Sequence, residues 1–275
     1  MGYQIEYAYT SHIGRIRANN EDNFWCLGET MTADNQGTEG VRTGTAVQAQ
    51  FPLMAVFDGM GGESCGEMAA FLAADACGRH YSEHKHELGS QPEQFLEELC
   101  RQMNRSVFEY SVKNKIRTMG TTAAMLAIGE ESAYACNLGD SRLYLSQQGK
   151  FHQISSDHVL KGGFFCKPPL TQYVGMDDAA VALEPHICRM ECSPGSRYLI
   201  CSDGMTDMLS DGEMADILAR EIPVQETAEI LLERALGKGG RDNITLILCE
   251  VKEEKKKRFF QWLESRRKTM RGDKL

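Results

Sequence analysis

The chain has 275 residues, of which 42% are hydrophobic and 25% charged, the balance of an ordinary globular protein. Its net charge of −9 is uneven: the part from Lys252 onward holds ten Lys and Arg against four Asp and Glu, and the rest holds 20 basic against 35 acidic residues. An acidic body argues against a nucleic-acid binder and is typical of a protein that gathers carboxylates around cations.

Short β-like runs separated by turn signals dominate the chain. The predicted strands are residues 5–9, 23–27, 53–58, 121–128, 132–138, 142–146, 151–154, 197–201 and 243–250. Two helices are predicted after the third strand and two before the last, at residues 65–81, 92–113, 211–220 and 224–236. Strands, paired helices and further strands in this order predict an α+β layered domain.

Three segments do not follow this pattern. Residues 29–50 are polar, rich in Gly and Thr and non-periodic, so we expect a long hairpin loop. Residues 161–169 form a connection rich in Gly and Pro. Residues 252–275 form a basic tail, predicted to be helical in its middle, after a domain of residues 1–251. Aromatic residues among its basic ones are typical of docking on an anionic membrane or a partner, with a solvated or packed terminal helix as the alternative.

The ten cysteines are scattered, and several lie in apolar runs. No export signal is visible at the start of the chain, so we expect free buried thiols in a reducing compartment. No stretch is long and apolar enough to predict a membrane span. The expectation is a cytoplasmic monomer.

Acidic residues placed at strand ends or turns carry the most chemical information. They are Asp22, Asp58, Asp140, Asp203 and Asp242. One Asp-Gly pair is an ordinary turn signal, but five acidic strand ends indicate a shared site. Carboxylates gathered at one end of a sheet repel one another, and divalent cations relieve that repulsion. Hard oxygen ligands predict Mg²⁺ or Mn²⁺, and two ions about 3.5–4 Å apart would activate a water and clamp a phosphoryl oxygen. Arg17 adds a planar cation suited to phosphate.

Seven short motifs that contain these residues follow one another along the chain. They are Arg17-x-x-Asn20-Glu21-Asp22, Asp58-Gly59-Met60-Gly61-Gly62 with Gly66-Glu67, Met119-Gly120-Thr121-Thr122, Gly139-Asp140-Ser141-Arg142, Asp157-His158, Ser202-Asp203-Gly204 and Asp242-Asn243-Ile244-Thr245. In this order they resemble the metal-dependent type 2C (PPM) serine/threonine protein phosphatases, closest to the compact bacterial branch. The resemblance implies a four-layer αββα sandwich: two antiparallel β-sheets flanked by helical pairs, here with a shortened flap.

The resemblance also implies a metal centre. Asp58 would bridge two Mn²⁺ or Mg²⁺ ions, and the Gly59 carbonyl would bind one of them. Asp203 and Asp242 would complete the shell of the second ion. In the bacterial branch Asp140, together with Asp203, resembles the site of a third, weaker metal.

The implied reaction is hydrolysis of phosphoserine and phosphothreonine on proteins by a metal-activated water at the binuclear centre. Asp22 would act through a metal-bound water, and Arg17 would bind the phosphate. The expected partners are phosphoproteins, a bacterial Ser/Thr kinase and its substrates. The alternative is a catalytically weak or inactive sensing or binding module of the same fold.

Two departures from the family pattern concern the chemistry. Met60 occupies a position where some members carry a His proposed as general acid, so another group must protonate the leaving group. Between His158 and Leu170 the family's helical flap is reduced to a short connection, and Gln172 stands where the motif usually carries Arg. A short flap predicts a more open cleft and altered substrate docking, although no predicted metal ligand lies in it.

A rival motif must also be considered. The run from Cys136 to Arg142 fits the Cys-x-x-Gly-x-x-Arg pattern of cysteine-dependent tyrosine phosphatases. That chemistry needs a phosphate-binding loop followed by a helix. Here Cys136 lies in an apolar strand, Asp140 would repel phosphate, and another strand is predicted to follow.

Overall fold

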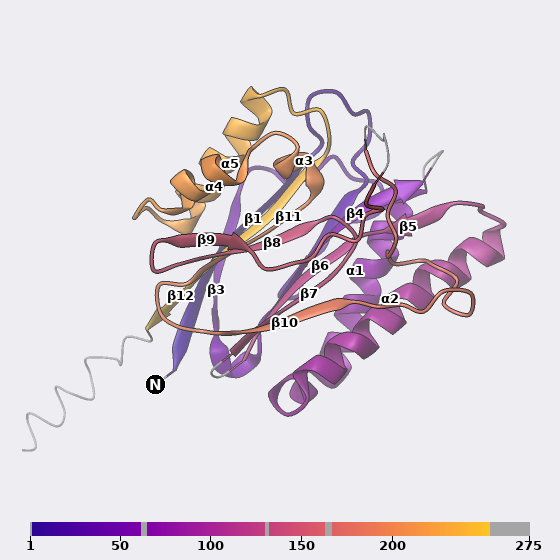
Figure 1. Cartoon of the computed structure of the whole chain (residues 1–275), viewed down its shortest axis with the longest axis horizontal. Helices are drawn as coiled ribbons and strands as arrows, with labels where there is room; N and C mark the ends of the chain where they lie inside the picture. Colours follow the sequence, from indigo (N-terminus) through magenta and orange to yellow (C-terminus); the bar gives the residue numbers. More distant parts are fainter. Residues whose placement is uncertain (1, 62–64, 130–131, 163–166, 254–275) are drawn as a thin grey trace, which may run out of the picture.

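The computed structural model describes residues 2–61, 65–129, 132–162 and 167–253 (Figure 1). Its elements are β1 (Tyr3–His12), β2 (Asp22–Cys26), β3 (Arg42–Val47), η1 (Gln48–Gln50), β4 (Leu53–Gly61), α1 (Gly66–His84), η2 (Lys85–Gly89), α2 (Pro92–Asn114), β5 (Met119–Thr121), β6 (Ala123–Ile128), β7 (Ser132–Leu138), β8 (Arg142–Gln147), β9 (Lys150–Gln153), β10 (His186–Glu191), β11 (Arg197–Cys201), α3 (Asp203–Thr206), α4 (Asp211–Leu218), α5 (Val224–Gly237) and β12 (Ile244–Glu253). The predicted helices and strands are present with small shifts at their ends, except that the predicted strand 121–128 is divided between β5 and β6.

Two antiparallel sheets form the centre of the molecule. One has the strand order β3-β1-β12-β11-β8-β9, and the other has the order β10-β7-β6-β4-β2, with β5 paired to the end of β4. The first sheet brings the two ends of the described chain together, since β1 pairs with β12 along its whole length.

The strands alternate between two apolar faces. In β12, Ile247 and Cys249 face the core between the sheets, whereas Leu246 and Leu248 pack against the helices. A strand that is apolar on both faces must be covered on both sides, and this period of two produces the layers.

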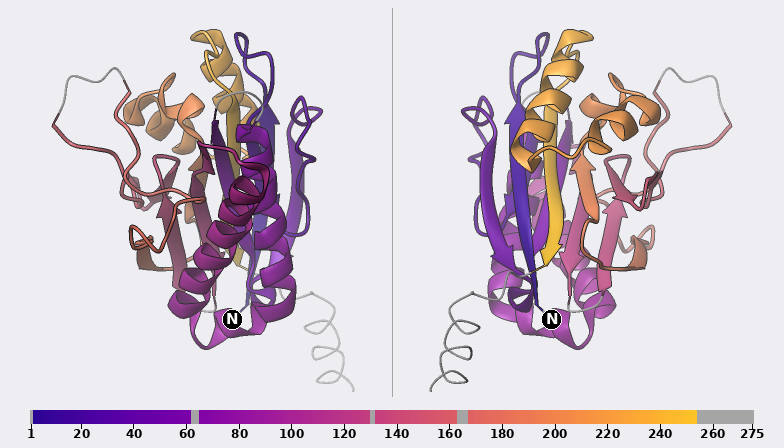
Figure 2. Two further views of the ribbon diagram at one scale, coloured as in Figure 1. Left: turned by 90° about the vertical axis from the view of Figure 1, so that its right-hand side faces the viewer. Right: turned by 90° about the vertical axis from the view of Figure 1, so that its left-hand side faces the viewer.

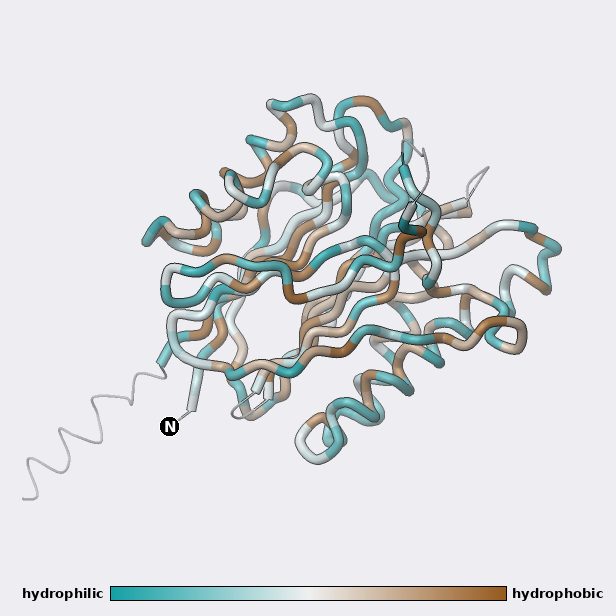
Figure 3. Tube along the Cα trace, in the orientation of Figure 1, coloured by the Kyte–Doolittle hydropathy of each residue, from teal (hydrophilic) through white to brown (hydrophobic). Residues whose placement is uncertain are grey.

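A helical pair covers the outer face of each sheet (Figures 1 and 2). The buried residues of α2, which include Leu96, Leu99, Cys100, Met103 and Val107, recur at helical spacing and pack with α1 against the second sheet. The α4 and α5 helices, with the short α3, pack against the first sheet. Hydrophilic and hydrophobic residues accordingly alternate along the helices in Figure 3. The predicted αββα sandwich is confirmed.

Three sequence-based assignments need correction. Residues 29–50 are not a plain hairpin loop, because they contain β3. The β3 strand is mostly exposed and contains Gly44, so only its backbone pairing with β1 reveals it. The β10 strand at the edge of the second sheet is half exposed and was missed for the same reason. The predicted strand 121–128 is split into β5 and β6, which pair with different parts of β4.

The last strand continues past the predicted domain boundary, since β12 ends at Glu253. The rest of the predicted tail, residues 254–275, lies outside the described residues, so neither its helix nor its docking is tested. Within the described part of the chain, no helix combines the length and apolar character needed to cross a membrane.

Candidate active site

The first two acidic residues lie opposite each other on neighbouring strands. The β2–β4 register pairs Asp22 with Asp58. The backbone N–H of Asp58 donates to Thr122 Oγ1 at 3.0 Å, and Thr121 Oγ1 donates to the Asp58 carbonyl at 2.9 Å. The break between β5 and β6 thus uses both threonines of the Thr-Thr motif to hold the backbone of Asp58.

Gly59 follows Asp58 where β4 runs close to two other backbone segments. A Cβ at this position would lie 2.1 Å from the Gly66 carbonyl oxygen and 2.5 Å from that of Glu21. Glycine is therefore required for packing. Its carbonyl as a metal ligand stays a prediction.

Asp203 and Asp242 are brought together by a second close approach. Asp203 is the first residue of α3, and Asp242 lies just before β12. A Cβ on Gly204 would lie 2.0 Å from the carbonyl oxygen of Asn243, so only glycine lets α3 contact this turn. The Asp-Gly sequence here serves the contact between two segments about forty residues apart, as well as the turn itself.

The pKa values of Asp58 and Asp22 shift as expected for carboxylates that lie close together. Burial, followed by the carboxylates of Asp203 and Asp22, raises the pKa of Asp58 well above its usual range. Burial raises the pKa of Asp22 to about 7, although hydrogen bonds from Thr245 and Ser202 oppose the shift, and Asp203 and Asp242 add to it. The predicted acidic set therefore converges at one end of the sandwich.

Asp140 joins the same region from the turn after β7. Burial, and then the charge of Asp203, raises the pKa of Asp140 to about 6. Asp140 also lines a pocket of about 310 Å³. The residues lining this pocket are Asp58, Met60, Thr122, Asp140, Lys167, Pro168, Pro169 and Leu170. The shortened flap therefore borders the acidic site.

Two cationic side chains pair with members of the acidic set. Arg17 Nη2 lies 2.7 Å from Asp242 Oδ2, and its side chain is 47% exposed. Lys167 Nζ forms an ion pair with Asp203 Oδ2. Positive charge is needed here because the carboxylates are partly desolvated and repel one another.

The donor set fits hard divalent cations, since it consists of carboxylates with backbone carbonyls nearby. In the described ranges, no three His, Cys, Asp or Glu side chains are grouped so as to hold one metal ion. Asp203 and Asp242 each pair instead with a basic side chain. A divalent cation could bind Asp203 or Asp242 only by displacing these basic partners.

The remaining motif residues support the site. Asn243 donates from Nδ2 to the carbonyls of Ile13 and Asn19, and its Oδ1 accepts the Glu21 N–H at 2.8 Å. This side chain ties the Arg17 loop to the start of β12. His158 accepts the Gly139 N–H on Nδ1 at 3.2 Å and so supports the turn after β7.

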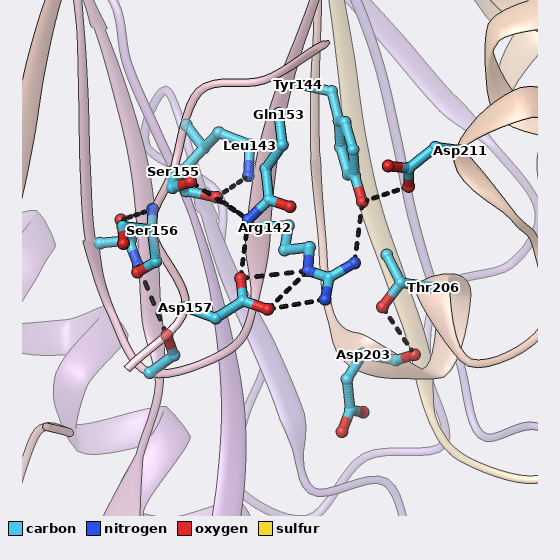
Figure 4. A network of polar contacts seen from close by, with 12 residues as sticks. Arg142, Leu143, Tyr144, Gln153, Ser155, Ser156, Asp157, Asp203, Thr206 and Asp211 are labelled. Atoms are coloured by element: carbon cyan, nitrogen blue, oxygen red, sulfur yellow. Dashed lines mark hydrogen bonds and ion pairs between the residues drawn. The ribbon is translucent and has the colours of Figure 1, made fainter. Parts of the chain in front are cut away.

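A network of ion pairs and hydrogen bonds around Arg142 lies beside α3 (Figure 4). Arg142 holds both carboxylate oxygens of Asp157, with Nη2 to Oδ2 at 2.6 Å. It also donates to Tyr144 Oη, which donates to Asp211 at 3.0 Å. The residue types alone could have suggested that Arg142 and Asp157 pair, because a bidentate Arg–carboxylate contact suits these two side chains.

Lys167 is the residue at this site that the sequence did not predict. It lies in a short, breaker-rich connection without periodicity, and it comes 36 residues before Asp203. The only sequence feature that could have placed Lys167 near the site is that its connection lies between the Asp157-His158 and Asp203-Gly204 motifs. The expectation of an open cleft is therefore incomplete, because flap residues line the pocket and one of them reaches an acidic residue.

The rival cysteine motif does not form a phosphate-binding loop. Cys136 is fully buried in β7, with its sulfur 3.6 Å from that of Cys100. A hydrogen bond with Cys100 and burial raise the pKa of the Cys136 thiol well above its usual range. Arg142 begins the strand β8, not a helix. A buried thiol of raised pKa is inert as a nucleophile, so this reading is excluded.

Comparison with known proteins agrees with the geometry. A family model described as protein phosphatase 2C matches residues 42–238. The chain is 29% identical over 216 residues to protein phosphatase PhpP of Streptococcus pneumoniae, which covers 74% of this chain and 87% of that protein.

Solved structures extend the likeness to most of the chain. The S. agalactiae serine/threonine phosphatase has a TM-score of 0.74 at 26% identity and covers 90% of this chain and 99% of that one. The catalytic domain of the serine/threonine protein phosphatase PstP, in complex with two manganese ions, has a TM-score of 0.71 at 27% identity and covers 91% and 100%.

The chain therefore belongs to the protein phosphatase 2C family. This confirms the predicted family and the prediction that the chain is an enzyme, a protein phosphatase. The roles of its individual site residues stay predictions.

Proposed function

We propose that this protein hydrolyses phosphoserine and phosphothreonine on other proteins at a centre of two Mn²⁺ or Mg²⁺ ions. The observation that carries the proposal is the convergence of buried and half-buried carboxylates at one end of the sandwich, beside an exposed arginine. Family membership and the manganese complex of PstP support it.

Asp58, Asp203 and Asp242 would hold the two ions, with the Gly59 carbonyl as a further ligand and Asp140 with Asp203 at a third, weaker site. When bound, the divalent cations supply Lewis-acid activation of a water and neutralise phosphoryl charge. The raised pKa values of Asp58 and Asp140 support these assignments, because such carboxylates gain most from a cation.

Other side chains of the chain bind and orient. Arg17 would exchange Asp242 for a phosphoryl group, since its guanidinium is exposed and can pair with two oxygens. Asp22 would act as hydrogen-bond acceptor for an attacking water, with its carboxylate oriented by Ser202 Oγ at 2.8 Å. Met60 has no proton to donate, and the Nδ1 atom of His158 accepts the Gly139 N–H, so this nitrogen cannot donate to the leaving group.

The proposed substrates are phosphoproteins, with a Ser/Thr kinase and its targets as the opposing system. Eight described cysteines, namely Cys26, Cys77, Cys100, Cys136, Cys188, Cys192, Cys201 and Cys249, form no disulfide, which supports the proposed cytoplasmic location. We propose residues 1–251, extended by the end of β12, as the catalytic domain of a monomer. Removal of residues 254–275 should then leave peptide hydrolysis unchanged, and a large loss of rate would place the tail within the catalytic unit.

The decisive assay is release of phosphate from a phosphothreonine peptide by the purified full chain with millimolar Mn²⁺. We expect turnover that EDTA abolishes and that Asp203→Asn lowers by at least about a hundredfold. The exposed Asp178→Asn is the matched control and should retain full activity. Turnover no higher than that of Asp203→Asn would refute catalysis and favour the inactive binding module.

A further inference from the structure

The shortened flap places a lysine in the acidic pocket. Lys167 Nζ pairs with Asp203, whose side chain is only 7% exposed, while that of Lys167 is 60% exposed. The ammonium group therefore reaches inward from solvent to a buried carboxylate. Lys167 lines the pocket together with Asp58 and Asp140, so its ammonium group also feels the charges of these two carboxylates.

The position of Lys167 is set by the base of the flap. Val159 and Leu170 form a β-bridge, and the Leu160 N–H donates to the Pro169 carbonyl at 2.9 Å. Two prolines follow Lys167 and restrict the backbone between it and this bridge. The backbone on the C-terminal side of Lys167 is thus restricted, while its four-carbon stem lets the ammonium group move by several ångströms.

Lys167 and a divalent cation compete for Asp203. Both are positive, and both would approach the same carboxylate in a partly desolvated pocket, so binding of one disfavours the other. When a divalent cation takes the carboxylate, the ammonium group must turn to another anion within reach of its stem. The anion that enters this pocket during the proposed reaction is the phosphoryl group of the substrate, and Lys is a common phosphate ligand.

We propose that Lys167 is a substrate-positioning residue: it neutralises Asp203 before divalent cations bind and then binds the phosphoryl group of the substrate. It would do so from the flap, whereas Arg17, which pairs with Asp242, comes from the loop before β2. This role does not need a helical flap, because Lys167 in the short connection already reaches Asp203. The inference rests on the proposed function for its second step, whereas the competition with metal does not depend on turnover.

The test compares Lys167→Met with Lys161→Met, an exposed lysine of the same connection, and with Lys167→Arg. Calorimetric titration of the full chain with Mn²⁺, without substrate, should show about three- to tenfold tighter binding for Lys167→Met. Lys161→Met should bind Mn²⁺ as the wild type does. An unchanged or weaker Mn²⁺ affinity in Lys167→Met would overturn the competition.

The substrate step is tested on the Mn²⁺-loaded proteins with inorganic phosphate as the probe. Thermal-shift titration should show about tenfold weaker phosphate binding in Lys167→Met, with recovery in Lys167→Arg. The KM for a phosphothreonine peptide should rise by a similar factor, while kcat changes less. A merely structural lysine would alter neither phosphate affinity nor KM, and wild-type values in Lys167→Met would overturn the substrate role. If the wild type shows no turnover, the proposed function fails, but Mn²⁺ and phosphate titrations still decide the role of Lys167.

Discussion

Replacement of Asp22 by asparagine should stabilise the metal-free protein while damaging its chemistry. Asp22 is 1% exposed and accepts a hydrogen bond from Ser202 Oγ at 2.8 Å. Asparagine keeps the shape and an oxygen for Ser202, but it removes a charge that is both buried and surrounded by other carboxylates. Its amide group can donate to the neighbouring carboxylates.

The magnitude follows from the pKa of Asp22, which burial raises from 3.8 to about 7. Because the folded pKa is above the unfolded one, the carboxyl favours the fold most below about pH 4, and this contribution is lost as the pH rises through 7. The full difference corresponds to about 4 kcal/mol at pH 8. Neighbouring carboxylates share the protons, so we expect Asp22→Asn to gain only part of this stability. The gain should be ~2 kcal/mol at pH 8 and under ~1 kcal/mol at pH 5.

The assay is thermal unfolding of the EDTA-treated chain at pH 8 and pH 5. Asp22→Asn should raise Tm by about 4–8 °C at pH 8 and much less at pH 5. Exposed Asp178→Asn is the control, with no change expected at either pH. With Mn²⁺ present, the wild type should have a higher Tm than Asp22→Asn, since bound metal stabilises the wild type more. A variant that is equally destabilised at both pH values would refute the proposed carboxylate repulsion.

Three further predictions concern single side chains. Arg142→Met removes a bidentate clamp and should lower the free energy of unfolding by about 2 kcal/mol in urea titrations, and an unchanged value would mean that the clamp is dispensable. Gly204→Ala places a Cβ 2.0 Å from the Asn243 carbonyl, so we expect a loss of at least ~2 kcal/mol together with lower Mn²⁺ affinity, whereas Gly212→Ala, which meets open space, should be nearly neutral. Cys136→Ser should keep Mn²⁺-dependent hydrolysis in folded protein, and loss of turnover with an intact fold would revive the cysteine mechanism.

Much of the fold could be predicted from the sequence because the signals are local. An apolar run such as Leu199–Ser202 predicts a buried strand, and the Asp203-Gly204 pair after it predicts the end of that strand. In the helices rich in Ala and Leu, the apolar residues recur at helical spacing, which predicts a helix with one buried face. The order of the acidic motifs was likewise enough to predict a phosphatase of the 2C family.

Tertiary structure decided the features that depend on neighbours. The exposed strand β3 is held by backbone pairing with β1, which leaves no apolar period in its side chains. Gly59 and Gly204 each lie against the backbone of a segment distant in sequence, where a side chain would not fit. Their Asp-Gly pairs therefore allow these backbone contacts as well as forming turns.

The acidic turns themselves were visible in the sequence, but their partners were not. Only the pairing of β2 with β4 brings Asp22 beside Asp58, and only the contact of the short flap with α3 brings Lys167 to Asp203. An ion pair between residues 36 positions apart leaves no periodic signal, because its energy depends on where two loops meet in space. The sequence therefore determined the chemistry of the acidic site, and the tertiary structure determined which cations share it.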